Sequence, residues 1–194
     1  MDLDERVIRA VARHPEVRRL ELVGSRATGE ARKESDWDFR VEAEDFASVA
    51  AALPELLAPL GPLAQQWDRL SDQQCWMLIL HGPAKVDLIF PDEPHEHEPP
   101  WVPRADNLQA LDSHFWDWIL WLRAKEAAGK NDLVATELRK LFDHLLHPLG
   151  VEKIPLLLSE AVARYQTARD RAELRTGRVV SRALEREVAP VLGR

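Results

Sequence analysis

The sequence predicts an α+β fold, in which a mixed sheet flanked by helices is followed by an all-helical domain. Short apolar runs with strand-like alternation dominate the first part of the chain, and helical spacing dominates the rest. Between them lies PDEPHEHEPPWVP at 91–103, whose five prolines remove backbone donors and fix φ. We therefore expect one domain over 1–92, a proline-rich linker over 93–106 and a helical domain over 107–194.

The first domain is expected to alternate helices and strands. Apolar residues at helical spacing predict a helix over 3–13, and Asp45 can act as the N-cap of a second helix that contains Pro54. Strands are predicted at 20–23, 37–41, 64–70, 74–80 and 85–90. The last two strands flank a short turn and are expected to form a hairpin.

The second domain is expected to contain three helices. The first covers 108–128 and ends at Gly129, the second covers 132–147, and a single long third helix runs from Pro155 towards the end of the chain. An aromatic cluster lies on the first of these helices and is expected to belong to the core rather than to form a ligand platform. Its members are Phe115, Trp116, Trp118 and Trp121.

The charge and cysteine content exclude several classes of protein. The 194 residues include 26 Lys or Arg and 33 Asp or Glu, a formal net charge of −7, which argues against binding of nucleic acid or membranes by bulk charge. The single cysteine, Cys75, excludes an intrachain disulfide and a multi-cysteine zinc site. The acidic N-terminus does not have the pattern of a signal peptide, and the apolar run 75–80 is too short to span a membrane. We expect a cytoplasmic protein.

The chemistry is concentrated in VGSRATGEARKESDWDFRVE at 23–42. A strand ends at Gly24 and Ser25, and Asp36 and Asp38 lie two residues apart at the start of the next strand, so their side chains share one face. Two carboxylates on one face repel each other unless a cation lies between them, and oxygen ligands suit Mg²⁺ or Mn²⁺. In the loop, Gly24 permits close approach of a phosphate, Ser25 offers a hydroxyl and Arg26 a positive charge.

A third carboxylate, Asp87, is the only acid in the apolar strand KVDLIF at 85–90. A lone acid in such a strand costs free energy unless it is exposed or paired. If this strand lies beside the one that carries Asp36 and Asp38, the three carboxylates form one site. Such a site can hold two metal ions about 4 Å apart for phosphoryl chemistry.

Together, Gly24-Ser25, the Asp36-x-Asp38 pair and the later Asp87 resemble the DNA polymerase β-type nucleotidyltransferases. The pattern is most similar to that of small aminoglycoside or streptomycin adenylyltransferases and minimal nucleotidyltransferases, and it covers roughly residues 20–90. The resemblance implies that Asp36 and Asp38 ligate both metal ions. It also implies that Asp87 ligates the catalytic metal and helps to deprotonate the attacking hydroxyl.

For the substrates, the resemblance implies that Gly24 and Ser25 bind the β- and γ-phosphates of a nucleoside triphosphate, expected to be ATP, and that Arg26 contacts phosphate. The implied reaction transfers a nucleoside monophosphate to a hydroxyl of a small, cationic acceptor such as an aminoglycoside, with Mg²⁺ as cofactor. AMP transfer to a protein or RNA, and a non-catalytic nucleotide-binding module, remain alternatives, as do monomer and homodimer. Candidate lysines for reaching the triphosphate lie in the helical domain at Lys125, Lys130 and Lys140.

Overall fold

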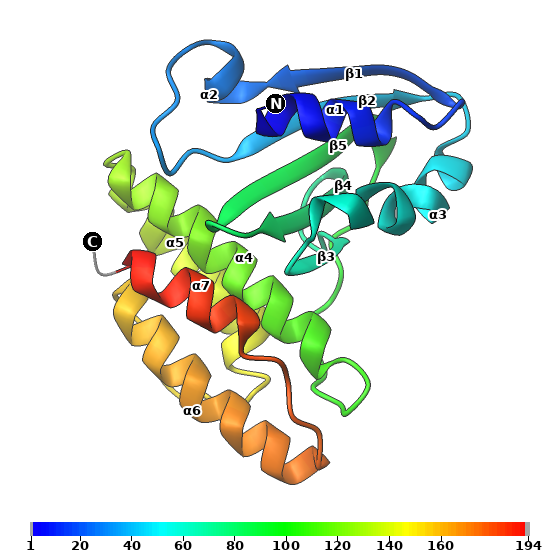
Figure 1. The fold of residues 1–194 in the computed structure, drawn as a ribbon. Helices are drawn as coiled ribbons and strands as arrows, with labels where there is room; N and C mark the ends of the chain where they lie inside the picture. The colour runs from blue at the N-terminus through cyan, green and yellow to red at the C-terminus, as the bar shows by residue number, and fades with distance from the viewer. Residues whose placement is uncertain (1, 193–194) are drawn as a thin grey trace. The chain divides into compact units, whose positions relative to one another are not determined.

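The computed structural model describes residues 2–192 and divides into two compact units, Met1–Glu98 and Pro99–Arg194 (Figure 1). The division falls inside the proline-rich segment from which the sequence predicts a linker. The first unit contains all five strands of the described chain, and the second is built from helices.

A mixed five-stranded sheet forms the centre of the first unit, in the order β1-β2-β5-β4-β3. Strands β2 and β5 run parallel, and the other neighbouring strands are antiparallel. The predicted α+β fold with a mixed sheet is thus confirmed. The elements of this unit are α1 (Leu3–Val11), β1 (Val17–Val23), α2 (Gly24–Ala27), β2 (Trp37–Ala43), α3 (Phe46–Leu57), the 3₁₀ turn η1 (Ala58–Leu60), β3 (Ala64–Trp67), β4 (Gln73–Leu80) and β5 (Ala84–Pro94).

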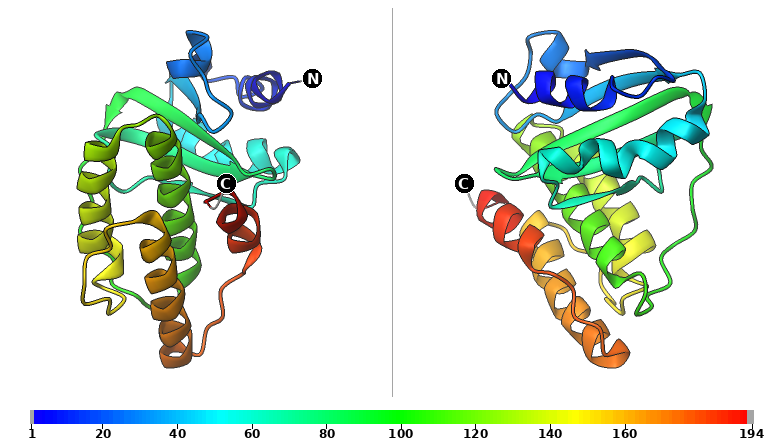
Figure 2. Two further views of the ribbon diagram at one scale, coloured as in Figure 1. Left: turned by 90° about the vertical axis from the view of Figure 1, so that its left-hand side faces the viewer. Right: turned by 45° about the vertical axis from the view of Figure 1, so that its right-hand side comes forward.

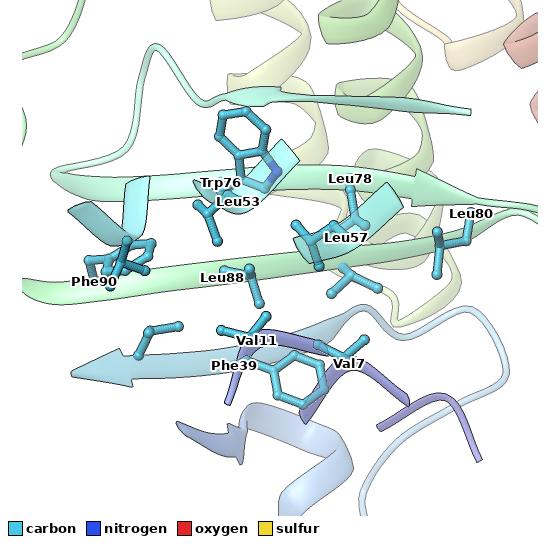
Figure 3. Packing of buried hydrophobic residues seen from close by; sticks show 13 residues of the cluster. Val7, Val11, Phe39, Leu53, Leu57, Trp76, Leu78, Leu80, Leu88 and Phe90 are labelled. Carbon is cyan, nitrogen blue, oxygen red and sulfur yellow. The ribbon is translucent and has the colours of Figure 1, made fainter. Parts of the chain in front are cut away.

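Helices α1 and α3 cover the same face of this sheet (Figure 2). Their apolar residues, Val7 and Leu53 among them, pack against side chains such as Phe39 of β2 and Leu88 of β5, all fully buried (Figure 3). Burial of each large apolar side chain contributes about 1.5–3 kcal/mol. Because successive side chains of a strand point to opposite faces, the residues next to Phe39 and Leu88 point away from this core.

Two local features of the first unit bear on the sequence predictions. The predicted N-cap is confirmed, since Asp45 Oδ1 accepts a hydrogen bond from the backbone N–H of Ser48 at 3.0 Å. Strand β5 is longer than predicted, because it continues through Pro94, which pairs with Gln73 of β4. The pairing of β5 with β2 ends at Ile89, so the missing N–H groups of the prolines beyond it interrupt no hydrogen bond with β2.

The second unit consists of α4 (Leu108–Ala127), α5 (Asn131–Leu141), the π-helical turn η2 (Phe142–Leu146), α6 (Leu158–Thr176) and α7 (Ala183–Leu192). The prediction of one long third helix was wrong. Gly177 adopts a φ of +67° and ends α6, and the chain forms a separate helix, α7, after it. Pro155 lies before α6 and not in its first turn.

Three of the four aromatic residues of the α4 cluster, Phe115, Trp116 and Trp118, are buried as predicted, whereas Trp121 is only half-buried. Phe115 and Trp116 are fully buried, and Phe115 stacks on Tyr165 of α6 with ring centroids 3.6 Å apart. Within residues 2–192, no helix has both the length and the apolar character needed to cross a membrane.

Candidate active site

The first component of the candidate site is the turn between β1 and β2. Gly24 directly follows β1 with a φ of +68°, and a Cβ atom at this position would lie 2.6 Å from Asp38 Oδ2. Such a contact is far closer than carbon and oxygen atoms allow, so a side chain here would displace the Asp38 carboxylate. Glycine is therefore required both by the backbone conformation and by the approach of Asp38.

Next to it, Arg26 connects this turn to the start of β2. Its Nε donates to the carbonyl oxygens of Ser35 and Asp36, both at 3.1 Å, and its Nη2 donates to Ser35 O at 2.6 Å. The guanidinium also lies 3.8 Å over the ring of Trp37. Burial lowers the pKa of Arg26, while the charges of Asp36 and Asp38 act in the opposite direction. The visible role of Arg26 is to fix the backbone that carries Asp36; its predicted phosphate contact stays a prediction.

Two of the three predicted carboxylates lie side by side. Asp38 of β2 and Asp87 of β5 are register partners on adjacent parallel strands, and both lie on the face opposite the helix-covered core. We call these two residues the aspartate pair. Asp36 lies one residue before β2 and is 6% exposed.

Sequence reasoning missed one charged residue of this site, Lys85. Its Nζ lies 2.5 Å from Asp87 Oδ1, and the whole residue is 6% exposed. A signal was present, because Lys85 and Asp87 are two residues apart on one strand and must share a face. The lysines considered instead lie in the helical unit, where Lys140 forms an ion pair with Glu137 at 2.6 Å.

The chemistry of these residues fits a divalent cation that prefers oxygen. Carboxylate oxygens are the ligands that Mg²⁺ favours, and the aspartate pair supplies them from two rigid neighbouring strands. In the described part of the chain, however, no three His, Cys, Asp or Glu side chains are grouped so that they could hold a metal ion. The structure thus brings Asp38 and Asp87 together, and the three-carboxylate cluster with Asp36 stays a prediction.

Comparisons with known proteins agree with this arrangement of elements. Residues 4–98 match the family of nucleotidyltransferase domains. A sequence search of curated proteins gave no match. The matched residues comprise the sheet, α1 and α3, together with the Gly24 turn and the aspartate pair.

Solved structures of nucleotidyltransferases resemble the chain at low sequence identity. A cytoplasmic RNA terminal U-transferase has 16% identity and a TM-score of 0.37, over 75% of this chain and 34% of its own. Cid1, described as having RNA terminal uridylyl transferase activity, has 16% identity and a TM-score of 0.36, over 76% of this chain and 35% of its own. The chain thus spans about a third of the length of these two proteins.

An aminoglycoside 6-adenyltransferase from Bacillus subtilis has 9% identity and a TM-score of 0.36, over 97% of this chain and 95% of its own. None of these three similarities is strong enough to assign an acceptor. The family match of residues 4–98 is what identifies the first unit as a nucleotidyltransferase domain.

Proposed function

We propose that the chain is an Mg²⁺-dependent nucleotidyltransferase that transfers a nucleoside monophosphate from ATP to a hydroxyl of a small, cationic acceptor. The observation that carries the proposal is the register of Asp38 with Asp87 beside the Gly24 turn. Asp38 and Asp87 lie side by side, and the space next to the Asp38 carboxylate is so small that only a glycine, Gly24, fits there. A purely structural sheet gains nothing from such a concentration of negative charge.

In the proposed reaction, the acceptor oxygen forms a bond to the α-phosphorus, and the bond from that phosphorus to the pyrophosphate oxygen breaks. Asp38 and Asp87, with Asp36, would hold the metal, which when bound neutralises charge on the phosphoryl oxygens. Asp87 would accept the proton of the attacking hydroxyl. Arg26 fixes the start of β2, and Gly24 leaves the room that the Asp38 carboxylate needs.

The nature of the acceptor is the least supported part of the proposal. The net charge of −7 favours a cationic small molecule over a polyanion. Transfer of AMP to a protein or to RNA is the second candidate, and the cytoplasm is the expected compartment for either.

The experiment incubates the protein with ATP labelled at the α-phosphate, Mg²⁺ and three acceptor classes: aminoglycosides, tRNA and proteins of a cell lysate. We expect label on an aminoglycoside and its loss in Asp87→Asn. The matched control is Asp92→Asn, the same substitution at an exposed position of the same strand, which should retain activity. Label on tRNA or protein alone would replace the proposed acceptor, and labelling that survives Asp87→Asn would contradict the proposed site.

A further inference from the structure

Lys85 has no part in the mechanism proposed above, yet its ammonium lies against Asp87, one member of the aspartate pair. Its Nζ is 2.5 Å from Asp87 Oδ1, and the side chains are 5% and 13% exposed. Val86, between them in sequence, is fully buried in the core on the other face, so the strand geometry forces Lys85 and Asp87 onto the same side. The ion pair is therefore fixed by the strand and not by a flexible surface contact.

The register of the sheet brings further negative charge to the same position. Trp37 of β2 pairs with Val86 of β5, so Asp36 and Lys85 are the residues that directly precede this pair on the two parallel strands. Asp38 follows it, opposite Asp87. One ammonium thus lies among the backbone positions of three acids. Lys85, Asp36 and Asp87 are at most 9% exposed, which limits screening of their charges by water, whereas Asp38 is half-buried.

We propose that Lys85 is the resident counter-ion of the aspartate pair, that its ammonium occupies the Asp87 oxygen a divalent cation requires, and that cation binding displaces it. This inference rests on the proposed function, because it takes the aspartate pair to be the cation site. Two positive charges on one carboxylate repel each other, so the ion pair and the cation compete. Lys85 therefore weakens the binding of free divalent cation to the protein and offsets one of the two negative charges when no cation is bound.

The competition makes a prediction opposite to that for an ordinary site residue: removal of Lys85 should strengthen metal binding. The experiment titrates the full chain with Mn²⁺ alone, without nucleotide, and measures the dissociation constant by calorimetry or by the electron paramagnetic resonance signal of free Mn²⁺. We expect Lys85→Met to bind Mn²⁺ about tenfold more tightly than the wild type, a typical effect of one nearby charge. Lys85→Arg, which retains the charge, should keep the affinity near that of the wild type.

Two further variants serve as controls for this result. Lys33→Met removes the same charge at an exposed position of the same unit and should leave the affinity unchanged. Lys85→Gln serves if the methionine variant does not fold, and it should show the same tightening. An Mn²⁺ affinity that is unchanged or weaker in the folded neutral variants would overturn the inference.

That failure differs from a failure of the proposed function. If the wild type transfers nucleotide and the neutral Lys85 variants bind Mn²⁺ no more tightly, the inference alone is refuted. If nucleotide transfer survives Asp38→Asn, the aspartate pair is not the catalytic centre and both are refuted.

Discussion

Each unit of the chain buries aspartate, but the two units hold it in different ways. In the helical unit, Asp112 of α4 is fully buried, and its Oδ1 accepts the hydroxyl hydrogen bond of Tyr165 at 2.6 Å. Arg169 of α6 lies 3.7 Å from the same carboxylate and also binds Glu185 of α7. We call these four residues the helical-unit network.

In the sheet unit, by contrast, Asp38 and Asp87 lie at adjacent positions with the ammonium of Lys85 on one of them. The helical-unit network joins three helices through two acids, a hydroxyl donor and a cation, which is how buried polar groups are normally stabilised. The aspartate pair gathers like charges instead. The comparison teaches that burial of an acid alone does not mark a functional site; our proposal rests on the two acids held in register.

The largest difference between the two units is expected when one acid of the aspartate pair is removed. Asp38→Asn should reduce nucleotide transfer by at least about a thousandfold, because the neutral amide removes charge from the proposed cation site. The free energy of unfolding should stay the same or rise, since a repulsion between neighbouring carboxylates is removed. Measurements of the transfer rate and of urea unfolding on the same variant check that activity is lost while stability is kept. A variant that loses stability and keeps its activity would reverse the assignment of the two regions.

The helical-unit network should make the free energy of unfolding depend on pH. Burial raises the pKa of Asp112 from 3.8 to about 6, against the opposing hydrogen bond from Tyr165 and the charge of Arg169. Because the folded state holds this proton more tightly than the unfolded state, the contribution of Asp112 to stability is greatest below the unfolded pKa and declines as the pH rises through the folded one.

Asp112→Asn removes that dependence. Relative to the variant, the wild type should lose on the order of 3 kcal/mol in free energy of unfolding between about pH 4 and about pH 7. Urea unfolding at several pH values measures the difference. Two curves that run parallel over this range would show that Asp112 does not titrate there, and nucleotide transfer at neutral pH should be little affected.

Two glycine variants are expected to have smaller effects. Together they distinguish the cost of backbone strain from the cost of the close approach of Asp38. Gly24→Ala and Gly29→Ala each place a side chain at positive φ, +68° and +76°, which costs about 1–2 kcal/mol. The new Cβ would meet Asp38 Oδ2 only at Gly24, since nothing lies within 4 Å at Gly29. We expect similar losses of stability by thermal unfolding, and a loss of transfer of about tenfold in Gly24→Ala alone. Equal activity of the two variants would remove Gly24 from the site.

Most of the sheet unit could be predicted from the sequence, because its strands are short apolar runs and its acids follow a motif with fixed spacing. The alternation rule then suffices to place Asp38 and Asp87 away from the core. The same rule places Lys85 beside Asp87, but a lysine in an apolar strand belongs to no motif, and the lysines of the helical unit match the expected position no better.

The helical unit was harder to predict in detail. The apolar spacing of α6 and α7 does not reveal that Gly177 adopts a left-handed conformation between them, because a glycine near a helix end reads equally well as an interior residue. The contact of Asp112 with Tyr165 joins residues 53 positions apart, so local patterns contain no signal for it. Long-range pairing of this kind depends on how helices pack.

The most direct test of the central claim is a calorimetric titration of Mn²⁺ into the wild type, Asp38→Asn and the exposed control Asp92→Asn. If the aspartate pair is the cation site of a nucleotidyltransferase, the wild type and the control bind with equal affinity, and Asp38→Asn binds at least about tenfold more weakly. Equal affinity in all three proteins would contradict the account.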